Sequence, residues 1–208
     1  MHTTETTVAA GTKSKRRTKT AVFVEGAIMA ALATVLSYVR IFHFPWGGSI
    51  TLLSMLPIAI YSIRHGMKNG MMVSFLFALI QLAQGIVVDG LLAWGLTPVM
   101  LIGCIMLDYI LPFTVLGFAG MLRRKGTVGA VAGTTSVIVL RFASHTLSGV
   151  VIFHSAGKLW EGFSTDNEWL YSLLYNGAYM LPELVFTLVG AVILLRLPQT
   201  RKLFAANS

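Results

Sequence analysis

The stretch "PVMLIGCIMLDYILPFTVLGFAGML", residues 98–122, decides the fold class of this chain. Asp108 is its only charged residue, and nearly all the other positions are aliphatic, aromatic or small. A helix needs about 20 residues to cross a hydrocarbon core of roughly 30 Å, and this run is long enough. Residues 98–122 are therefore predicted to span a membrane as a helix.

Similar apolar runs recur along most of the chain after residue 20. Of the 208 residues, 55% are hydrophobic and 12% are charged, a balance that soluble domains rarely show. The pattern predicts an all-α integral membrane protein with a multi-pass topology. We expect six transmembrane helices, at about residues 21–42, 50–64, 69–88, 98–122, 127–153 and 169–195.

The basic residues lie in short clusters between the apolar runs. If the N-terminus is inside the cell, four clusters fall on the cytoplasmic side, as the positive-inside rule requires; they begin at Lys13, Arg64, Arg123 and Arg196. Membrane orientation, and not nucleic-acid binding, thus accounts for the net charge of +8. Both termini are predicted to be cytoplasmic. The expected organisation is a disordered basic tail (1–20), a six-helix transmembrane domain (21–197) and a short tail (198–208).

Motifs for several other functions are missing from the sequence. Cys104 is the lone cysteine and lies inside an apolar run, so neither a disulfide framework nor a cysteine-based metal site is expected. No phosphate-binding loop of the form GxxxxGK[ST] occurs, which indicates that the chain does not hydrolyse ATP by itself. We predict no catalytic residue, no metal and no cofactor.

Polar and aromatic side chains gather at similar depth in the outer half of the predicted bundle. Asp108 lies about ten residues, or roughly 15 Å, below the outer end of its helix. A charge at the bilayer centre costs about 2.5–3.5 kcal/mol, so Asp108 is expected to face protein, water or a ligand. His145 and Ser148 share one face of the fifth helix with Arg141. The other groups at this level are Trp46, Gln81, Gln84, Tyr171 and Asn176.

These groups predict a cavity that opens to the outside and holds a small, flat, cationic heteroaromatic molecule. A carboxylate offsets the positive charge of the ligand, and each aromatic ring adds about 0.5–2 kcal/mol of cation–π attraction. An amide can form hydrogen bonds with the edge of a heteroaromatic ring. Simpler alternatives are an ion pair between Asp108 and Arg141, a packing role for His145, and an interfacial role for Trp46.

The first predicted helix carries two stripes of mostly small residues at i, i+4 spacing, which let another helix approach closely. One stripe consists of Gly26, Ala30 and Thr34, and the other consists of Ala27, Ala31 and Val35. Both are candidates for docking a partner protein. The alternative is packing inside the same chain.

Several segments resemble one known family, the thiamine-specific substrate-binding (S) components of energy-coupling factor (ECF) transporters. They are "GGSITLLSMLPI", "RHGMKNG", "LDYILPFTVLGFAG", "RFASHTLSGVVIF" and "WLYSLLYNGAYM", and the resemblance extends over about residues 21–195. It implies a six-helix protein of the bacterial plasma membrane that captures thiamine from outside. Delivery then requires an ECF module of two ATPases and a transmembrane coupling subunit, which the family contacts through small residues on the first helix.

The resemblance also implies roles for individual residues. The acidic residue near the thiazolium falls on Asp108, with Tyr109 as its neighbour, and the pocket histidine falls on His145. Tyr171 and Asn176 match the residues around the aminopyrimidine. A tryptophan that caps the site in some members matches Trp46. Some members have glutamate at the position of Asp108, tyrosine at that of Pro98 and a stacking tryptophan at that of Phe153, which makes Phe153 a further candidate.

Three alternatives differ in function class. The chain could be an S component for another heteroaromatic vitamin or a thiamine precursor. It could be a stand-alone secondary carrier, although no inverted repeat relates its halves. An intramembrane serine protease is suggested by His145 and Ser148, but both lie on one predicted helix and the serine is in "TLSG" instead of a "GxSG" turn.

Overall fold

The computed structural model describes residues 18–44 and 48–198. Trp46 and nearly all of the two predicted tails lie outside the described residues. The helical elements are α1 Lys19–Tyr38, α2 Leu56–His65, α3 Met67–Val87, η1 Leu91–Ala93, α4 Pro98–Cys104, η2 Ile105–Ile110, α5 Leu111–Thr114, η3 Val115–Lys125, α6 Gly126–Val151 and α7 Glu168–Arg196. The strands are β1 Arg40–His43, β2 Ser49–Thr51, β3 Gly157–Trp160 and β4 Phe163–Thr165.

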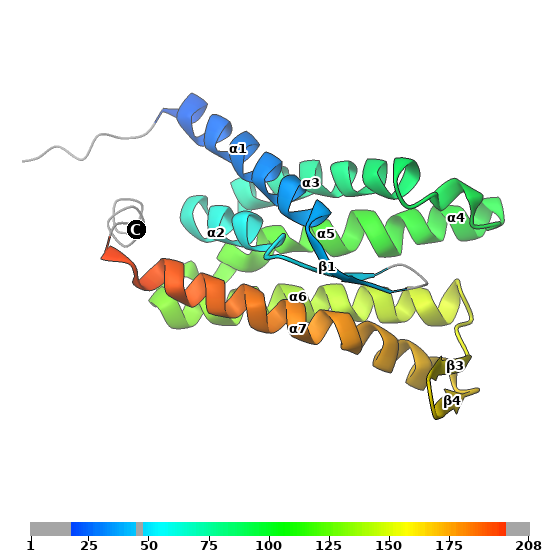
Figure 1. Ribbon diagram of the computed structural model, residues 1–208. Helices are drawn as coiled ribbons and strands as arrows, with labels where there is room; N and C mark the ends of the chain where they lie inside the picture. Colours follow the sequence, from blue (N-terminus) through cyan, green and yellow to red (C-terminus); the bar gives the residue numbers. More distant parts are fainter. Residues whose placement is uncertain (1–17, 45–47, 199–208) are drawn as a thin grey trace, which may run out of the picture.

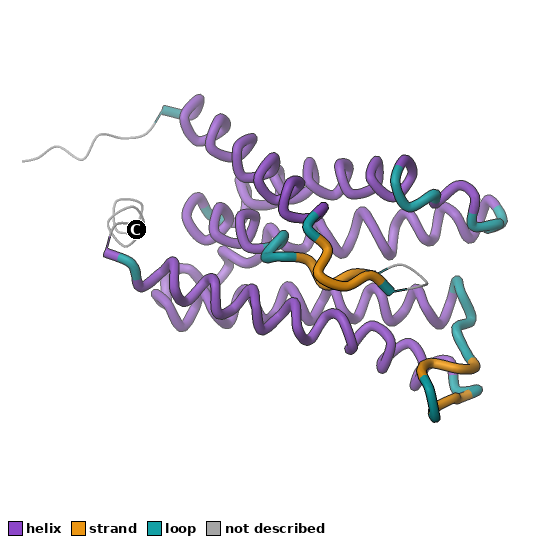
Figure 2. Tube along the Cα trace, viewed as in Figure 1, coloured by secondary structure: helices purple, strands orange, loops and turns teal. Residues whose placement is uncertain are grey.

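The long helices run side by side in one bundle (Figures 1 and 2). The start of α1 and the end of α7 lie at the same end of the bundle, and β3 and β4 lie at the opposite end (Figure 1). Four helical stretches are long and apolar enough to cross a membrane: Lys19–Tyr38, Met67–Val87, Pro98–Val151 and Glu168–Arg196. The third has 54 residues and reverses direction at Gly126, whose φ is +66°. The chain is thus a predominantly helical membrane protein.

α2 is shorter than a membrane-spanning helix. It has 10 residues, or about 15 Å of helix, which is too little to cross a bilayer alone. Eight of its residues are nevertheless buried, because α1, α3, η3 and α7 surround it. The count of six spanning helices and the cytoplasmic position of both termini stay predictions.

The predicted helices 21–42 and 50–64 are wrong near the loop that joins them. α1 ends at Tyr38, and β1 and β2 form an antiparallel hairpin in which Arg40 faces Thr51 and His43 faces Ser49. Val39, Ile41 and Phe42 are β-branched or aromatic residues, which favour extended backbone once the helix has ended. A second hairpin joins β3 to β4. The all-α prediction is therefore corrected to a helical bundle with two small hairpins.

The predicted helix 98–122 is one helical passage, but its geometry changes along its length. Residues Ile105–Ile110 form a π-helical segment, and the Leu111 N–H donates to the Met106 carbonyl five residues earlier. Pro112 follows and has no N–H to donate, so a regular ladder is interrupted at this point. Asp108 and Tyr109 lie inside the π-helical segment.

Close packing holds the second half of this passage against α2. Ser62 donates from its hydroxyl to the Gly117 carbonyl, and the Gly120 N–H donates to the Ser62 Oγ at 3.0 Å. A Cβ at Gly120 would overlap the Ser62 carbonyl, so only glycine permits this approach. The residues around Tyr61, Phe77 and Leu116 form the buried core beside it.

Candidate functional site

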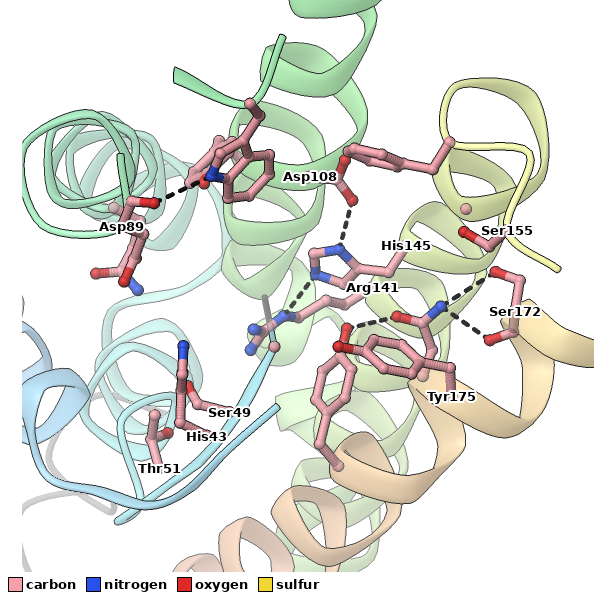
Figure 3. A pocket seen from close by; sticks show the side chains of 18 of the residues that line it. His43, Ser49, Thr51, Asp89, Asp108, Arg141, His145, Ser155, Ser172 and Tyr175 are labelled. Carbon is pink, nitrogen blue, oxygen red and sulfur yellow. Dashed lines mark hydrogen bonds and ion pairs between the residues drawn. The ribbon is translucent and has the colours of Figure 1, made fainter. Parts of the chain in front are cut away.

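A cavity of about 1120 Å³ lies between the hairpin β1–β2, α3, η2, α6 and α7. His154, Ser155 and Lys158, which surround the start of β3, line the cavity at the end of the bundle opposite the described chain ends. Figure 3 shows labelled side chains of the hairpin, η2, α6 and α7, with Asp89 just after α3, around one space. The predicted cavity in this half of the bundle therefore exists.

Asp108 and His145 form the central pair of the site. The Asp108 Oδ1 lies 2.9 Å from the His145 Nδ1, and the Ser148 hydroxyl donates to the other carboxylate oxygen. The two side chains of the pair are 18% and 11% exposed, so both are mostly withdrawn from solvent yet reach the cavity. Ser148 is fully buried and reaches the cavity only through Asp108.

Arg141 does not pair with Asp108, contrary to one alternative from the sequence. Its Nη1 lies 3.5 Å from the Glu183 Oε2, and its Nε donates to the His145 Nε2 at 3.4 Å. Figure 3 shows the resulting line from Asp108 through His145 to Arg141. The arrangement leaves the Asp108 carboxylate without a permanently charged partner.

Glu183 was missed at the sequence level. It is 2% exposed and accepts hydrogen bonds from the Thr51 N–H at 2.9 Å and from the Thr51 hydroxyl. The signal was present in "MLPELVF", where one acidic residue interrupts an apolar helix in the same way as Asp108. The rule that such residues face the protein interior applies equally to both.

α7 supplies an aromatic wall. Tyr171 and Tyr175 are stacked, with ring centroids 6.1 Å apart and 15° between the planes, and Tyr179 lies one turn further along the same face. All three line the cavity. Tyr175 and Tyr179 were not among the predicted binding residues, although their positions four and eight residues after Tyr171 indicate a shared face.

Asn176 is held in one orientation on this wall. Its amide nitrogen donates to the Ser172 carbonyl at 2.9 Å, and its oxygen accepts from the Tyr179 hydroxyl at 2.5 Å. Ser172 in turn donates to the Thr146 carbonyl of α6 at 2.8 Å, which joins the two helices. The amide lies at the cavity surface with a defined direction.

Four more of the predicted site residues also lie at the cavity. Tyr109, Gln81, Gln84 and Phe153 line the cavity. The Ser37 hydroxyl lies within hydrogen-bonding distance of the amide oxygens of Gln81 and Gln84, at 3.2 and 3.0 Å. These residues place α1 and α3 beside the cavity.

The hairpin β1–β2 is tied to the cavity rim. The Arg40 guanidinium binds Asp89 at the end of α3 through two contacts of 2.6 and 3.0 Å. With the Thr51–Glu183 contact, the hairpin is thus anchored to two helices on different sides. Because Arg40 neutralises Asp89, Asp108 is the acid of this cavity that has no arginine or lysine as an ion-pair partner among the described residues.

The two stripes of α1 face in different directions. Gly26 and Ala30 are buried, and a Cβ on Gly26 would lie 2.7 Å from the Val73 side chain. The Thr34 hydroxyl donates to the Ala30 carbonyl of its own helix at 2.8 Å. This first stripe packs inside the chain. Ala27, Ala31 and Val35 are exposed and form a free face of α1.

A protease dyad is not formed. Ser148 donates to Asp108, and the two His145 nitrogens are directed to Asp108 and Arg141. Neither ring nitrogen is therefore available to take a proton from the serine, as a nucleophilic serine requires. The suggestion of an intramembrane protease is wrong.

Comparisons with known proteins show which proteins this chain is similar to. The family described as "Thiamine transporter protein" matches residues 23–204. "Thiamine transporter ThiT" of Bacillus subtilis is 34% identical over 176 residues, which are 78% of this chain and 83% of that protein. The protein of the same name from Lacticaseibacillus paracasei is 27% identical over 189 residues, 84% of this chain and 86% of that protein.

A solved structure shares the fold. The structure described as ThiT from Listeria monocytogenes superposes with a TM-score of 0.66 at 25% sequence identity. The match covers 89% of this chain and 98% of that one.

Proposed function

Because the chain belongs to the thiamine transporter protein family, we propose that it binds thiamine from outside the cell as the S component of an ECF transporter. It is a transport protein and not an enzyme, and it is a multi-pass protein of the bacterial plasma membrane. In the proposed role, a separate module of two ATPases and a transmembrane coupling subunit supplies the energy for release inside.

The proposal rests mainly on the position of the Asp108 carboxylate. It lies in a large cavity, and its oxygens accept from neutral donors or an imidazole and do not face a fixed cation. Thiamine carries a permanent positive charge on its thiazolium ring. At about 4 Å and an effective dielectric constant near 20, two unit charges attract by about 4 kcal/mol.

The surrounding side chains suit the rest of the molecule. Tyr171, Tyr175 and Tyr179 offer ring faces for stacking on an aromatic ligand, and cation–π attraction adds to it. Hydrogen bonds to its partners fix the orientation of the Asn176 amide, which is proposed to form hydrogen bonds with the edge of the aminopyrimidine. Tyr109, His145 and Phe153 complete the proposed contacts, with Gln81 and Gln84 at the far wall.

The exposed stripe of α1 supports the proposed partner. Ala27, Ala31 and Val35 offer a shallow surface on which a helix of the coupling subunit can pack closely. Gly26, Ala30 and Thr34 support this surface from the inner side of the same helix and are not proposed as contacts.

Isothermal titration of the purified protein tests the ligand. We expect thiamine to bind far more tightly than millimolar and riboflavin, a heteroaromatic vitamin without a fixed charge, to give no measurable heat. Tight riboflavin binding with no thiamine binding would assign the protein to another vitamin.

Uptake into vesicles tests the energy source. Thiamine accumulation is expected only when the ECF module and ATP are both present. Accumulation by this chain alone would show a secondary carrier and contradict the proposed role.

A further inference from the structure

A second cavity, smaller than the one that contains Asp108, lies between α6 and α7. It is a groove of about 350 Å³, and Trp160 of β3 also lines it. Asn176 of α7 lines the large cavity, whereas the next residue, Gly177, lines the groove. The two cavities share no lining residue, so α7 separates them.

The groove is apolar along its whole length. α6 contributes Ile138, Val139 and Phe142, and α7 contributes residues between Leu173 and Leu184. Among the described residues, none with a charged, hydroxyl or amide side chain lines it. A polar ligand would lose its hydrogen bonds to water here and gain none, which is costly. The groove therefore suits a hydrocarbon group.

The groove has the length of one leaflet of a bilayer. Leu173 and Leu184 are eleven positions apart on α7, which corresponds to about 16 Å of helix. The hydrocarbon core of a membrane is about 30 Å thick, so one leaflet contributes about 15 Å. Both α6 and α7 lie in stretches that are long and apolar enough to cross a membrane. Lipid chains thus surround the opening of the groove.

Trp160 indicates which leaflet is involved. It lies on the hairpin β3–β4 beside the start of α7, at the end of the bundle that contains the large cavity (Figure 1). Its ring is stacked on Phe163, with the ring centroids 5.5 Å apart. Tryptophan is enriched where a membrane meets water. The groove is therefore expected to begin at that interface and to end near the middle of the bilayer.

The width of the groove distinguishes between a lipid chain and a protein helix. A volume of 350 Å³ over a length of about 16 Å gives a mean cross-section of roughly 20 Å². A helix about 10 Å wide has a cross-section of about 80 Å². A helix of a partner protein or of a second copy is too wide to enter, whereas a single extended hydrocarbon chain is not.

We propose that this groove binds one acyl chain of a phospholipid from the leaflet on the side of the large cavity, and retains it when the surrounding lipid is removed. The acyl chain lies behind the helix whose other side carries Tyr175 and Tyr179. Binding depends on apolar contact and on the space left by Gly177, where nothing lies within 4 Å of an added Cβ. The inference goes beyond the proposed function and does not depend on thiamine being the ligand.

Native mass spectrometry tests retention of the lipid. Protein loaded with phosphatidylcholine in detergent is passed through a column equilibrated in lipid-free detergent, and the lipid-bound fraction is measured. We expect the wild-type protein to keep about one phosphatidylcholine per chain. In Gly177→Leu the new side chain occupies the groove, and displacing two buried CH₂ groups of the lipid weakens its retention at least about tenfold.

Ser136→Leu is the matched control for this enlargement. Ser136 is exposed on α6 and does not line the groove, so this variant is expected to keep the lipid. Equal retention by wild-type protein and Gly177→Leu, or equal loss in both variants, would overturn the proposal. A species of two chains that disappears in Gly177→Leu would also overturn it, because the groove would then be an interface between copies.

Fluorescence quenching tests where the retained lipid lies, and it needs no substitution in the groove. Trp160 is kept as the one tryptophan by replacing Trp46, Trp94 and Trp169 with phenylalanine. The protein is loaded with phosphatidylcholine brominated in the middle of its acyl chains and is washed in the same way, since bromine quenches tryptophan on contact. We expect Trp160 to stay quenched relative to protein loaded with unbrominated lipid. Retained lipid without quenching of Trp160 would place the lipid elsewhere and contradict the inference.

Discussion

Thr51 of β2 donates both its backbone N–H and its side-chain hydroxyl to the Glu183 carboxylate of α7, at 2.9 and 2.5 Å. The two residues are 132 positions apart in the chain, and both are buried. Glu183 also contacts Arg141, so the hairpin, α6 and α7 meet at one carboxylate. The hairpin is consequently a fixed wall of the cavity in this structure.

Thr51→Val tests how much the contact between the Thr51 hydroxyl and Glu183 contributes to stability. The change keeps the shape and the backbone N–H but removes the hydroxyl, so a buried carboxylate loses one of its donors. We expect the free energy of unfolding to fall by about 1–3 kcal/mol. Thermal unfolding in detergent, followed by the loss of helical circular dichroism, measures the change.

Thr134→Val is the matched control. Thr134 is also fully buried, but its hydroxyl donates only to the Ala130 carbonyl of its own helix, at 2.8 Å. This carbonyl is within the regular hydrogen-bond ladder of α6, so we expect a change below about 0.5 kcal/mol. If both variants lost the same free energy of unfolding, the Thr51–Glu183 contact would stabilise the fold no more than a hydrogen bond within one helix.

Gly85→Ala probes the wall formed by Tyr109. A Cβ at Gly85 would overlap the Tyr109 ring and hydroxyl, so the ring must move within the cavity. We expect thiamine affinity to fall about tenfold in titrations of the purified protein, because the shape of the ligand space changes.

Gly177→Ala is the control for this substitution. Nothing lies within 4 Å of a Cβ built on Gly177, which also lies in a spanning helix. Alanine favours helix over glycine by up to about 1 kcal/mol, so this variant is expected to bind thiamine normally with unchanged or slightly higher stability. Normal binding by Gly85→Ala would show that Tyr109 does not shape the site.

The membrane class and the central acid could be predicted because both depend on hydropathy alone. Asp108 stands out as a charge inside an apolar run, and the runs themselves predict spanning helices. The hairpin β1–β2 could not be predicted in this way, because Ile41, Phe42 and Ile50 are as apolar as helix residues. Periodicity does not distinguish short apolar strands from helix ends.

The partner of Arg141 could not be predicted either. Arg141 is spaced i, i+4 from His145, which places the two on one face of α6, but spacing does not reveal which acid approaches from another helix. Asp108 and Glu183 were both available in the sequence, and only the packing of α7 against α6 and β2 decides between them. The direction of Asn176 depends in the same way on Ser172 and Tyr179.

Ala31→Leu tests the proposed docking face of α1. Ala31 is exposed, so the fold and thiamine binding by the purified protein are expected to stay unchanged. Uptake with the ECF module is expected to fall at least tenfold, because a larger side chain separates two helices that pack through small residues. Uptake of labelled thiamine by cells or proteoliposomes provides the measurement.

Ser136→Leu is the corresponding control on another helix. Ser136 is exposed on α6, and its hydroxyl donates only to the Ala132 carbonyl of the same helix. A similar enlargement there is expected to leave uptake unchanged. If both variants transport normally, the exposed stripe of α1 is not the docking face.

Asp108→Asn tests the charge on which the proposed site depends. The amide has nearly the same size and still accepts from Ser148, so the main change is the loss of one negative charge. The attraction of about 4 kcal/mol at 4 Å is an upper value for a site that water still reaches, and each 1.4 kcal/mol is tenfold in affinity. We therefore expect thiamine to bind about 100-fold more weakly, and no more than about 1,000-fold more weakly, measured by isothermal titration.

Asp89→Asn makes the same chemical change at the cavity rim and separates local charge from general electrostatic attraction. The Asp89 carboxylate already binds the Arg40 guanidinium at 2.6 Å, so its charge is compensated before a ligand arrives. Loss of the Asp89 charge is expected to weaken thiamine binding less than fivefold. The variant loses one contact at the cavity rim but keeps the Thr51–Glu183 contact that anchors the hairpin. Losses of equal size in the two variants would show that the cavity attracts a cation through its summed field, in which case Asp108 would not be the specific partner of the thiazolium ring.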